Sequence, residues 1–183
     1  MNQVAIAGIR GSYSESAASE YFDGDIELVE CSTFEGAFGA LRSGLAEYAV
    51  IPVRNSIVGE IASTKSLMKK KRPKVVDHVK IRIEHVLAGV QGATFDDLSI
   101  VRSHAEALKQ CSSFLTANPH LEQLTGFDTA SSVRSIVVAG LVRNAAICSV
   151  RAAEIYGASI LRRRIADRAS NVTTFAVISI GKK

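Results

Sequence analysis

Residues 4–22 read VAIAGIRGSYSESAASEYF, and this stretch decides the class of fold. Val4 to Ala7 is a short apolar run typical of a buried strand. The turn Gly8-Ile9-Arg10-Gly11 follows, and a helix is predicted from about Ser14 to Phe22. A strand, a turn and a helix in succession form the unit from which α/β proteins are built.

The same alternation continues outward along the chain. Further strands are predicted at 28–29, 48–53, 75–90, 99–102, 121–127, 145–147, 159–164 and 172–180. Helices are predicted from a Ser32–Glu35 capping box to Ser43-Gly44, from Asn55-Ser56 to about Met68, at 103–117, at 128–140, and from Ser149 to Tyr156-Gly157. The pattern as a whole predicts an α/β fold.

The stretch from Val75 to Val90 is the longest predicted strand. Apolar residues alternate with polar ones at Val79, Ile81 and Ile83, as in a half-buried strand. Its length predicts a crossover between two lobes. We expect lobe 1 to hold residues 1–77 and 165–183, and lobe 2 to hold residues 78–164.

Composition narrows the class of protein. The chain has 183 residues, 47% of them hydrophobic and 22% charged, which is ordinary for a globular protein and excludes disorder and coiled coil. No apolar run approaches the roughly 20 residues of a membrane span, and Met1 to Ala7 lacks a signal-peptide pattern, so we expect a cytoplasmic protein. The three cysteines lie far apart, which predicts free thiols, with neither a disulfide framework nor a zinc site.

The formal net charge of +4 favours an anionic partner. Two basic runs, 69–74 and 162–164, are interpreted as solvated charge at a helix end and at a sheet edge. Aromatic residues do not interleave them, so a nucleic-acid partner is not expected.

Small hydroxyl or amide residues follow four of the predicted strands. They are Ser12 to Ser14, Asn55-Ser56, Ser103-His104, and Asp128 to Ser131. Helix N-termini at the carboxyl ends of strands offer free N–H groups, and they bind small anions. Each residue is also an ordinary N-cap, so the two readings stay open at any single junction. Four such junctions, distributed over both lobes, predict an anion-binding cleft between the lobes.

Five ordered blocks resemble the catalytic domain of prephenate dehydratases over nearly the whole chain. Residues 8–14 are similar to the family's Gly-x-x-Gly-(Thr/Ser)-(Tyr/Phe)-Ser, and residues 51–56 to its Val-Pro-Ile-Glu-Asn-Ser. Residues 103–111 match Ser-His-Pro-Gln-Ala-Leu-x-Gln-Cys in part, and Thr129-Ala130 matches part of Ser-Thr-Ala. The final block runs from Ala145 to Asn171 and Thr173-Thr174-Phe175, where the family ends in Asn-x-Thr-Arg-Phe.

The resemblance implies a fold like that of type II periplasmic binding proteins, with two lobes, an interlobe cleft and a homodimer. It implies a cofactor-free lyase that converts prephenate to phenylpyruvate, water and carbon dioxide in phenylalanine biosynthesis. The family often carries a C-terminal ACT domain that binds phenylalanine, and this chain shows none, so feedback through that module is not expected.

The resemblance also assigns roles to residues. Thr173 matches the threonine that serves the departing oxygen, and Asn55 and Ser56 are assigned to catalysis beside it. Phe175 either shapes the pocket or is a core residue of its strand. The remaining matched positions are assigned to substrate binding: Ser12, Tyr13, Ser103, Thr129, Ala130 and Thr174.

Three residues depart from the family pattern. The motif arginine is Thr174, the motif glutamate is Arg54, and the motif glutamine is Glu106. We hypothesise that Arg54, with Arg10, supplies the guanidinium that holds a substrate carboxylate. Glu106 is either a general acid with a pKa raised by burial or the ion-pair partner of Arg54.

Two histidines are interpreted as residues without a catalytic role. His104 is read as a helix-start residue, and His85 as a residue of the crossover strand without chemical consequence.

Three functions remain at this point. The first is prephenate dehydratase activity. The second is a decarboxylase that keeps the ring hydroxyl, which the loss of the motif arginine favours. The third is a non-catalytic module of the same fold that binds a small anion.

Overall fold

The computed structural model describes residues 1–180, and these divide into two compact units. Unit 1 holds Met1–Ile83 and the segment from Ser170 onward, and unit 2 holds Glu84–Ala169. These boundaries lie a few residues beyond the expected ones at 77/78 and 164/165. The shift of the first boundary has a simple cause, because the strand that begins at Lys74 stays paired within unit 1 as far as Arg82.

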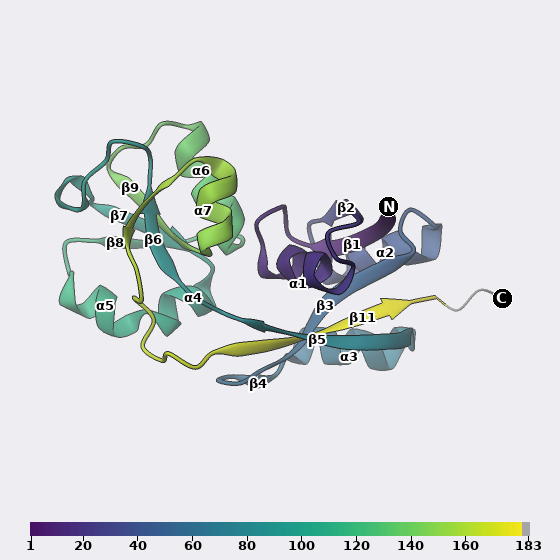
Figure 1. Ribbon diagram of the computed structural model, residues 1–183. Helices are drawn as coiled ribbons and strands as arrows, with labels where there is room; N and C mark the ends of the chain where they lie inside the picture. Colours follow the sequence, from purple (N-terminus) through teal and green to yellow (C-terminus); the bar gives the residue numbers. More distant parts are fainter. Residues whose placement is uncertain (181–183) are drawn as a thin grey trace. The chain divides into compact units, whose positions relative to one another are not determined.

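Unit 1 is built on a six-stranded sheet in the order β2-β1-β3-β11-β5, with β4 attached to β3. The strands are β1 (Asn2–Ala7), β2 (Ile26–Cys31), β3 (Tyr48–Asn55), β4 (Gly59–Glu60), β5 (Lys74–Arg82) and β11 (Val172–Ser179). The first three are parallel, whereas β11 runs antiparallel to both β3 and β5. The last strand of the chain is therefore an interior strand of this sheet (Figure 1).

Helices cover both faces of the unit 1 sheet: α1 (Tyr13–Tyr21), α2 (Phe34–Ser43) and α3 (Ala62–Lys71). Phe175 and Val177 pack in one buried cluster with Ala17 and Ala18 of α1. Ala176 and Ile178 pack in another cluster with residues of α2 and α3. Successive residues of β11 thus enter opposite layers, as the period of two in a strand requires.

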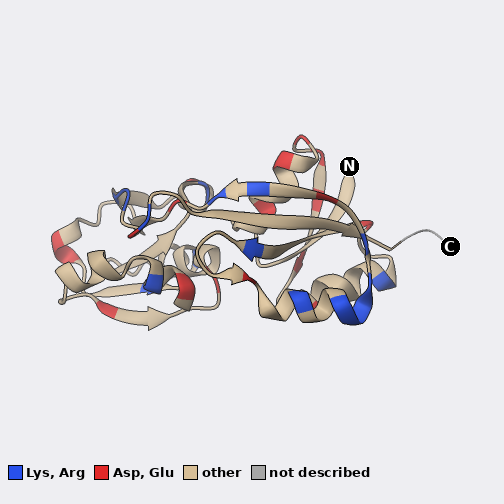
Figure 2. Ribbon diagram, turned by 90° about the horizontal axis from the view of Figure 1, so that it is seen from below, with Lys and Arg blue, Asp and Glu red and all other residues tan. Residues whose placement is uncertain are grey.

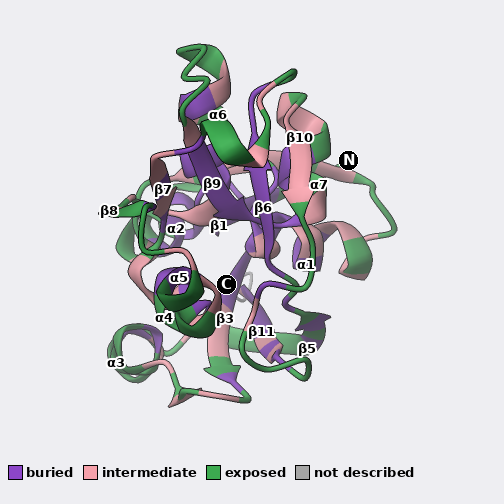
Figure 3. Cartoon of the chain, turned by 90° about the vertical axis from the view of Figure 1, so that its left-hand side faces the viewer, coloured by how far each residue is buried: buried purple, intermediate pink, exposed green. Residues whose placement is uncertain are grey.

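Unit 2 has a five-stranded sheet in the order β10-β6-β9-β7-β8. Its elements are β6 (Val86–Gly89), η1 (Phe95–Asp97), β7 (Ile100–Ser103), α4 (Ala105–Gln110), α5 (Ser112–Ala117), β8 (Glu122–Thr125), α6 (Thr129–Val138), β9 (Asn144–Cys148), α7 (Val150–Tyr156) and β10 (Ser159–Arg162). The central strands β6 and β9 are almost entirely buried (Figure 3). Apart from Asn144 at the start of β9, their residues are apolar, so no alternation of polar and apolar residues marks them.

Several predicted elements are wrong in detail. The stretch 75–90 is two strands, β5 and β6, in two different sheets. The predicted helix 103–117 is two helices, α4 and α5, interrupted at Cys111. No helix starts at Asn55-Ser56, because the chain makes the β3–β4 hairpin first. The α2 helix is capped by Thr33, whose side chain accepts from the N–H of Gly36, and not by Ser32.

The basic runs are exposed, as expected. Lys69, Lys70 and Lys71 form the last turn of α3, and Arg162 to Arg164 are exposed at and after edge strand β10. Figure 2 marks the Lys and Arg positions of the chain in blue. The three cysteines are free thiols, also as predicted. Burial raises the pKa of the Cys111 and Cys148 thiols to about 12. Within residues 1–180, no helix is long and apolar enough to span a membrane.

Candidate functional site

Three polar side chains are buried together where β3 ends and β11 begins. Asn55, Asn171 and Thr173 are 6%, 1% and 7% exposed. Asn55 Nδ2 donates to Asn171 Oδ1 at 2.7 Å and to Thr173 Oγ1 at 2.9 Å. Asn55 and Thr173 are also direct partners in the β3–β11 ladder, so the backbone register holds the contact. Strand pairing therefore brings together two of the residues that the resemblance assigned to catalysis.

The turn after β3 fixes the orientation of the Asn55 amide. The backbone N–H groups of Ile57 and Val58 both donate to Asn55 Oδ1, at 2.9 and 3.2 Å. An N–H group cannot accept, so the other end of the amide, Nδ2, must face Thr173. Thr173 Oγ1 therefore accepts from Asn55, and its own hydrogen stays available. Among the described residues, none accepts that hydrogen.

Arg54 and Thr174 lie on the neighbouring rung of the same ladder. Successive residues of a strand point to opposite faces, so both side chains leave the sheet on the face opposite to Asn55 and Thr173. Lys80 of β5 and Glu60 of β4 continue this rung. The hydrogen bond and charge of Lys65, with a smaller contribution from the Arg54 charge, lower the pKa of Glu60. Arg54 and Thr174, the two departures from the family pattern that involve an arginine, therefore lie on the face of the sheet opposite to the Thr173 hydroxyl.

For the prephenate dehydratase activity that the resemblance implies, we expect the Arg54→Ala variant to change KM by less than about threefold, because the Arg54 side chain leaves β3 on the face opposite to the Thr173 hydroxyl. Steady-state kinetics of the variant beside the wild type measures this. A KM raised tenfold or more would instead support the hypothesis that Arg54 holds a substrate carboxylate.

Other matched residues of unit 1 have structural partners. Ser56 Oγ accepts from the Val172 N–H, which ties the hairpin to β11. Ser12 caps α1 by accepting from the Glu15 N–H, and Tyr13 packs on the same cluster as Phe175. Phe175 is 2% exposed within that cluster, so the core reading of this residue holds. The backbone N–H of Arg10 donates to the exposed Glu30 carboxylate.

The remaining matched residues belong to unit 2. Ser103 is fully buried, and its hydroxyl donates to the Ile147 carbonyl oxygen at 2.7 Å. Asp128 caps α6, so Thr129 and the buried Ala130 form the first turn of that helix. His104 Nδ1 accepts from the Glu106 N–H, which confirms its predicted place at a helix start.

Glu106 is not in the buried environment that was expected for a general acid. Its side chain is 42% exposed, and its carboxylate pairs with Lys109 at 2.8 Å. The structure therefore argues against Glu106 as a general acid and gives it Lys109 as partner in place of Arg54.

Two side chains of unit 2, His85 and Asp167, have environments that the sequence did not predict. His85 is 4% exposed, its Nε2 lies 2.9 Å from Gln110 Oε1, and burial lowers its pKa despite this contact. His85 lies between β5 and β6, not in a strand. The Asp167 carboxylate accepts from the N–H groups of Ser112 and Ser113, at the first turn of α5. This tertiary cap explains why the predicted helix breaks at Cys111.

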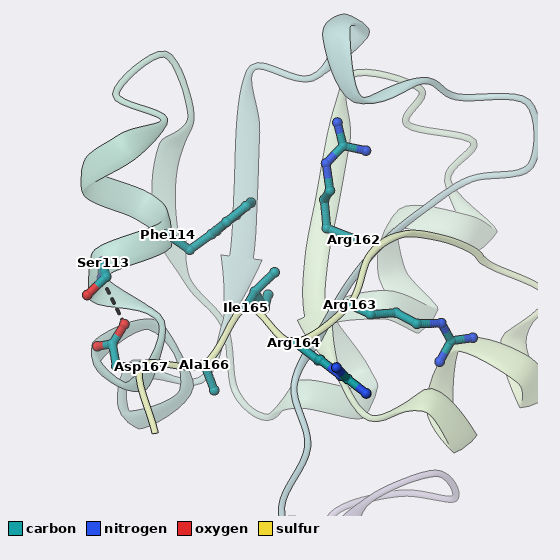
Figure 4. Close-up of a pocket in the computed structure, with 8 residues that line it drawn as sticks. All are labelled: Ser113, Phe114, Arg162, Arg163, Arg164, Ile165, Ala166 and Asp167. Carbon is teal, nitrogen blue, oxygen red and sulfur yellow. Dashed lines mark hydrogen bonds between the residues drawn. The ribbon is translucent and has the colours of Figure 1, made fainter. Parts of the chain in front are cut away.

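Asp167 borders a pocket of about 410 Å³ that is lined by residues 113–114 and 162–167. Figure 4 shows the guanidinium groups of Arg162, Arg163 and Arg164 pointing in different directions. Arg162 lies over the Phe95 ring, 4.1 Å from its centroid. The three guanidinium groups therefore do not converge on a site for one anion in this pocket. Within residues 1–180, no group of three His, Cys, Asp or Glu side chains could hold a metal ion.

The Asp167 cap makes the stability of unit 2 depend on pH. Partial burial acts to raise the pKa of Asp167, but hydrogen bonds from Ser112 and Ser113 outweigh it and lower the pKa. A carboxyl group whose pKa is lower in the folded chain stabilises the fold above its unfolded pKa, and loses that effect as the pH falls through the folded value. Asp167→Ala should therefore destabilise the protein at pH 7, and the difference should shrink below about pH 4.

Urea unfolding over a range of pH measures this difference. Asp96→Ala is the matched control, since Asp96 is exposed in the 3-10 turn and has no hydrogen bond to α5. A destabilisation by Asp167→Ala that is equally large at pH 3 would contradict the cap.

Comparison with known proteins places these observations in a family. The family model for prephenate dehydratase matches residues 4–183. The chain belongs to the prephenate dehydratase family. Arogenate dehydratase/prephenate dehydratase 1 of Arabidopsis thaliana is 37% identical over 97% of this chain and 45% of its own length. Arogenate dehydratase 2 of Petunia hybrida is 37% identical over 97% of this chain and 44% of its own. The chain thus spans about half the length of these curated relatives.

Solved structures confirm the fold expected for the prephenate dehydratase family. The prephenate dehydratase of Arthrobacter aurescens, in complex with L-Phe, superposes with a TM-score of 0.88 at 23% identity, over 99% of this chain and 61% of that one. The quorum-quenching acylase GqqA superposes at 0.86 with 29% identity, over 99% and 65%. A methionine-binding lipoprotein of Bacillus subtilis reaches 0.51 at 9% identity, over 98% and 83%. The expected α/β fold is therefore confirmed, and a methionine-binding lipoprotein shares its overall arrangement.

Proposed function

We propose that this chain converts prephenate to phenylpyruvate, carbon dioxide and water. The observation that carries the proposal is the Thr173 hydroxyl, which accepts from Asn55 and keeps its hydrogen for a ligand. Prephenate needs such a donor, because its ring hydroxyl is a poor leaving group. Family membership supports the same reaction.

The reaction is favourable because the ring of the substrate becomes aromatic, and the residues of the site assist it. The bond between the ring and its carboxylate breaks, and the electron pair moves into the ring as carbon dioxide leaves. That pair forms a new double bond of the ring while the C–O bond of the ring hydroxyl breaks. The oxygen leaves with the electrons of the C–O bond and takes up a proton from the solvent, which gives water. The ring becomes aromatic. A hydrogen bond from Thr173 Oγ1 strengthens as negative charge builds on the departing oxygen, so it lowers the barrier more than it tightens ground-state binding.

The deciding experiment follows the two products separately. The purified chain is incubated with prephenate, and phenylpyruvate and carbon dioxide are measured. The proposal expects them in equal amounts. Carbon dioxide without phenylpyruvate would mean a decarboxylase that keeps the ring hydroxyl. The loss of the motif arginine at Thr174 favours that alternative. Binding of prephenate without either product would mean a non-catalytic module.

The same assay run with arogenate addresses the substrate. The names of the plant relatives include arogenate dehydratase, and arogenate would give phenylalanine in place of phenylpyruvate. We place prephenate first because the motifs of this chain resemble those of prephenate dehydratases. A higher kcat/KM with arogenate would reverse that order.

We also propose that the functional form is a homodimer. The support is the family resemblance alone, and light scattering of the purified protein at assay concentration tests it. A monomeric mass with full activity would refute the proposal.

A further inference from the structure

Asn171 is the most deeply buried of the three polar side chains at the junction of β3 and β11. It is 1% exposed, and its Oδ1 receives one of the two Nδ2 hydrogens of Asn55. Its carbonyl oxygen accepts from the Ile83 N–H at 2.8 Å, which fixes its backbone against the end of β5. A buried amide is costly unless its partners are specific, so this residue is held for a definite contact.

Asn171 restrains the Asn55 amide from the side opposite to the turn. If the Asn55 amide were flipped, its oxygen would face Asn171 Oδ1, and its amino group would face the N–H groups of Ile57 and Val58. Both contacts would be repulsive, so the flipped state is disfavoured from two directions. In that flipped state Thr173 would donate its hydrogen to Asn55 Oδ1 and have none for a ligand.

We propose that Asn171 is a positioning residue for the reaction: through Asn55, it holds the Thr173 hydroxyl as an acceptor toward the protein and therefore as a donor toward the substrate. This inference rests on the proposed function, in which Thr173 assists the departing oxygen. Asn171 itself does not touch the substrate. Its effect should appear in kcat and not in KM, because the donor acts in the transition state.

The first test replaces Asn171 with leucine, which has a similar size but no acceptor. We expect kcat for prephenate to fall by about tenfold or more while KM stays within about twofold. Asn171→Asp keeps an acceptor oxygen for Asn55 and should recover most of kcat once its carboxyl is ionised, so its activity should rise with pH. Unchanged kcat in Asn171→Leu would overturn the proposal.

A double-mutant cycle separates positioning from general stability. When Thr173 is already valine, adding Asn171→Leu should lower kcat no further, since the hydroxyl to be oriented is gone. Equal losses of kcat in both backgrounds would show a purely structural role. Thr64→Val is the control, because Thr64 is fully buried in unit 1 and donates to the Pro52 carbonyl oxygen. It should lower stability and leave kcat unchanged.

An NMR measurement keeps the inference testable without activity. The two side-chain N–H signals of Asn55 are identified by their loss in Asn55→Asp. Thr173→Val should shift one of them, and Asn171→Asp the other. If Asn171→Leu does not fold, Thr173→Val and Asn171→Asp still test the proposal. If the wild type turns over no substrate, the proposed function fails. The NMR result then shows independently whether Asn55 donates one hydrogen to Thr173 and the other to Asn171. Unshifted signals would overturn the inference.

Discussion

The Thr173→Val variant is expected to lose about 10²- to 10³-fold in kcat for prephenate, the usual cost of deleting one transition-state hydrogen-bond donor. Valine keeps the shape and the β-branch of threonine, so β11 and its register should persist. KM should change little, since the hydroxyl contributes most when the ring oxygen departs. Phenylpyruvate formation measures kcat, and thermal unfolding measures the fold.

Thr173→Ser is the matched control, because serine retains the hydroxyl on the same rung as Asn55. It should keep activity within about tenfold of the wild type, the loss reflecting a freer side-chain torsion. If valine were tolerated at position 173 with an unchanged rate, the departing oxygen would have to be served by another group.

The Asn55→Asp variant should be almost as damaging, although it replaces one atom by another of similar size. Asp has no N–H, so a carboxylate oxygen would face both Asn171 Oδ1 and Thr173 Oγ1. Thr173 would then donate its only hydrogen to the protein, and kcat should fall by about 10²-fold or more. A charge in a side chain that is 6% exposed should also lower the melting temperature by several degrees, in the range known for buried unpaired groups.

Asn144→Asp provides the comparison, since Asn144 is half-buried at the start of β9 and its side chain has no hydrogen-bond partner among the described residues. This change should leave kcat unaltered. Asn55→Asp would contradict the hydrogen-bond polarity if it kept the wild-type rate and melted at the wild-type temperature.

The α/β class and most elements could be predicted because they depend on local pattern. The turn at Gly8–Gly11, the cap at Ser149 and the stop at Gly157 all depend on residues within a few positions of the element they end. The interruption at Cys111 could not be predicted in this way, since it depends on Asp167, which is 55 residues from Ser112. The split of 75–90 likewise depends on which sheet each half joins.

The residues of the site could be predicted from the sequence, but the direction of the hydrogen bond between them could not. The resemblance named Asn55 and Thr173, yet the direction of their hydrogen bond depends on the turn at Ile57 and on Asn171, which is 116 residues from Asn55. One signal in the sequence was missed. Arg54 adjoins Asn55 in β3 and Thr174 adjoins Thr173 in β11. The period of two in a strand would have placed Arg54 and Thr174 on the faces opposite to Asn55 and Thr173.

The place of β11 between β3 and β5 has a consequence for how the chain acquires its structure. Unit 2 is one continuous segment, so all its strands are available once residue 169 has been synthesised. Unit 1 must leave a gap in its sheet until β11 has been synthesised, because β3 and β5 pair with β11 and not with each other. Such long-range closure is slow. The strand that completes this sheet also carries Thr173, so unit 1 and the proposed catalytic group should become native in the same late step.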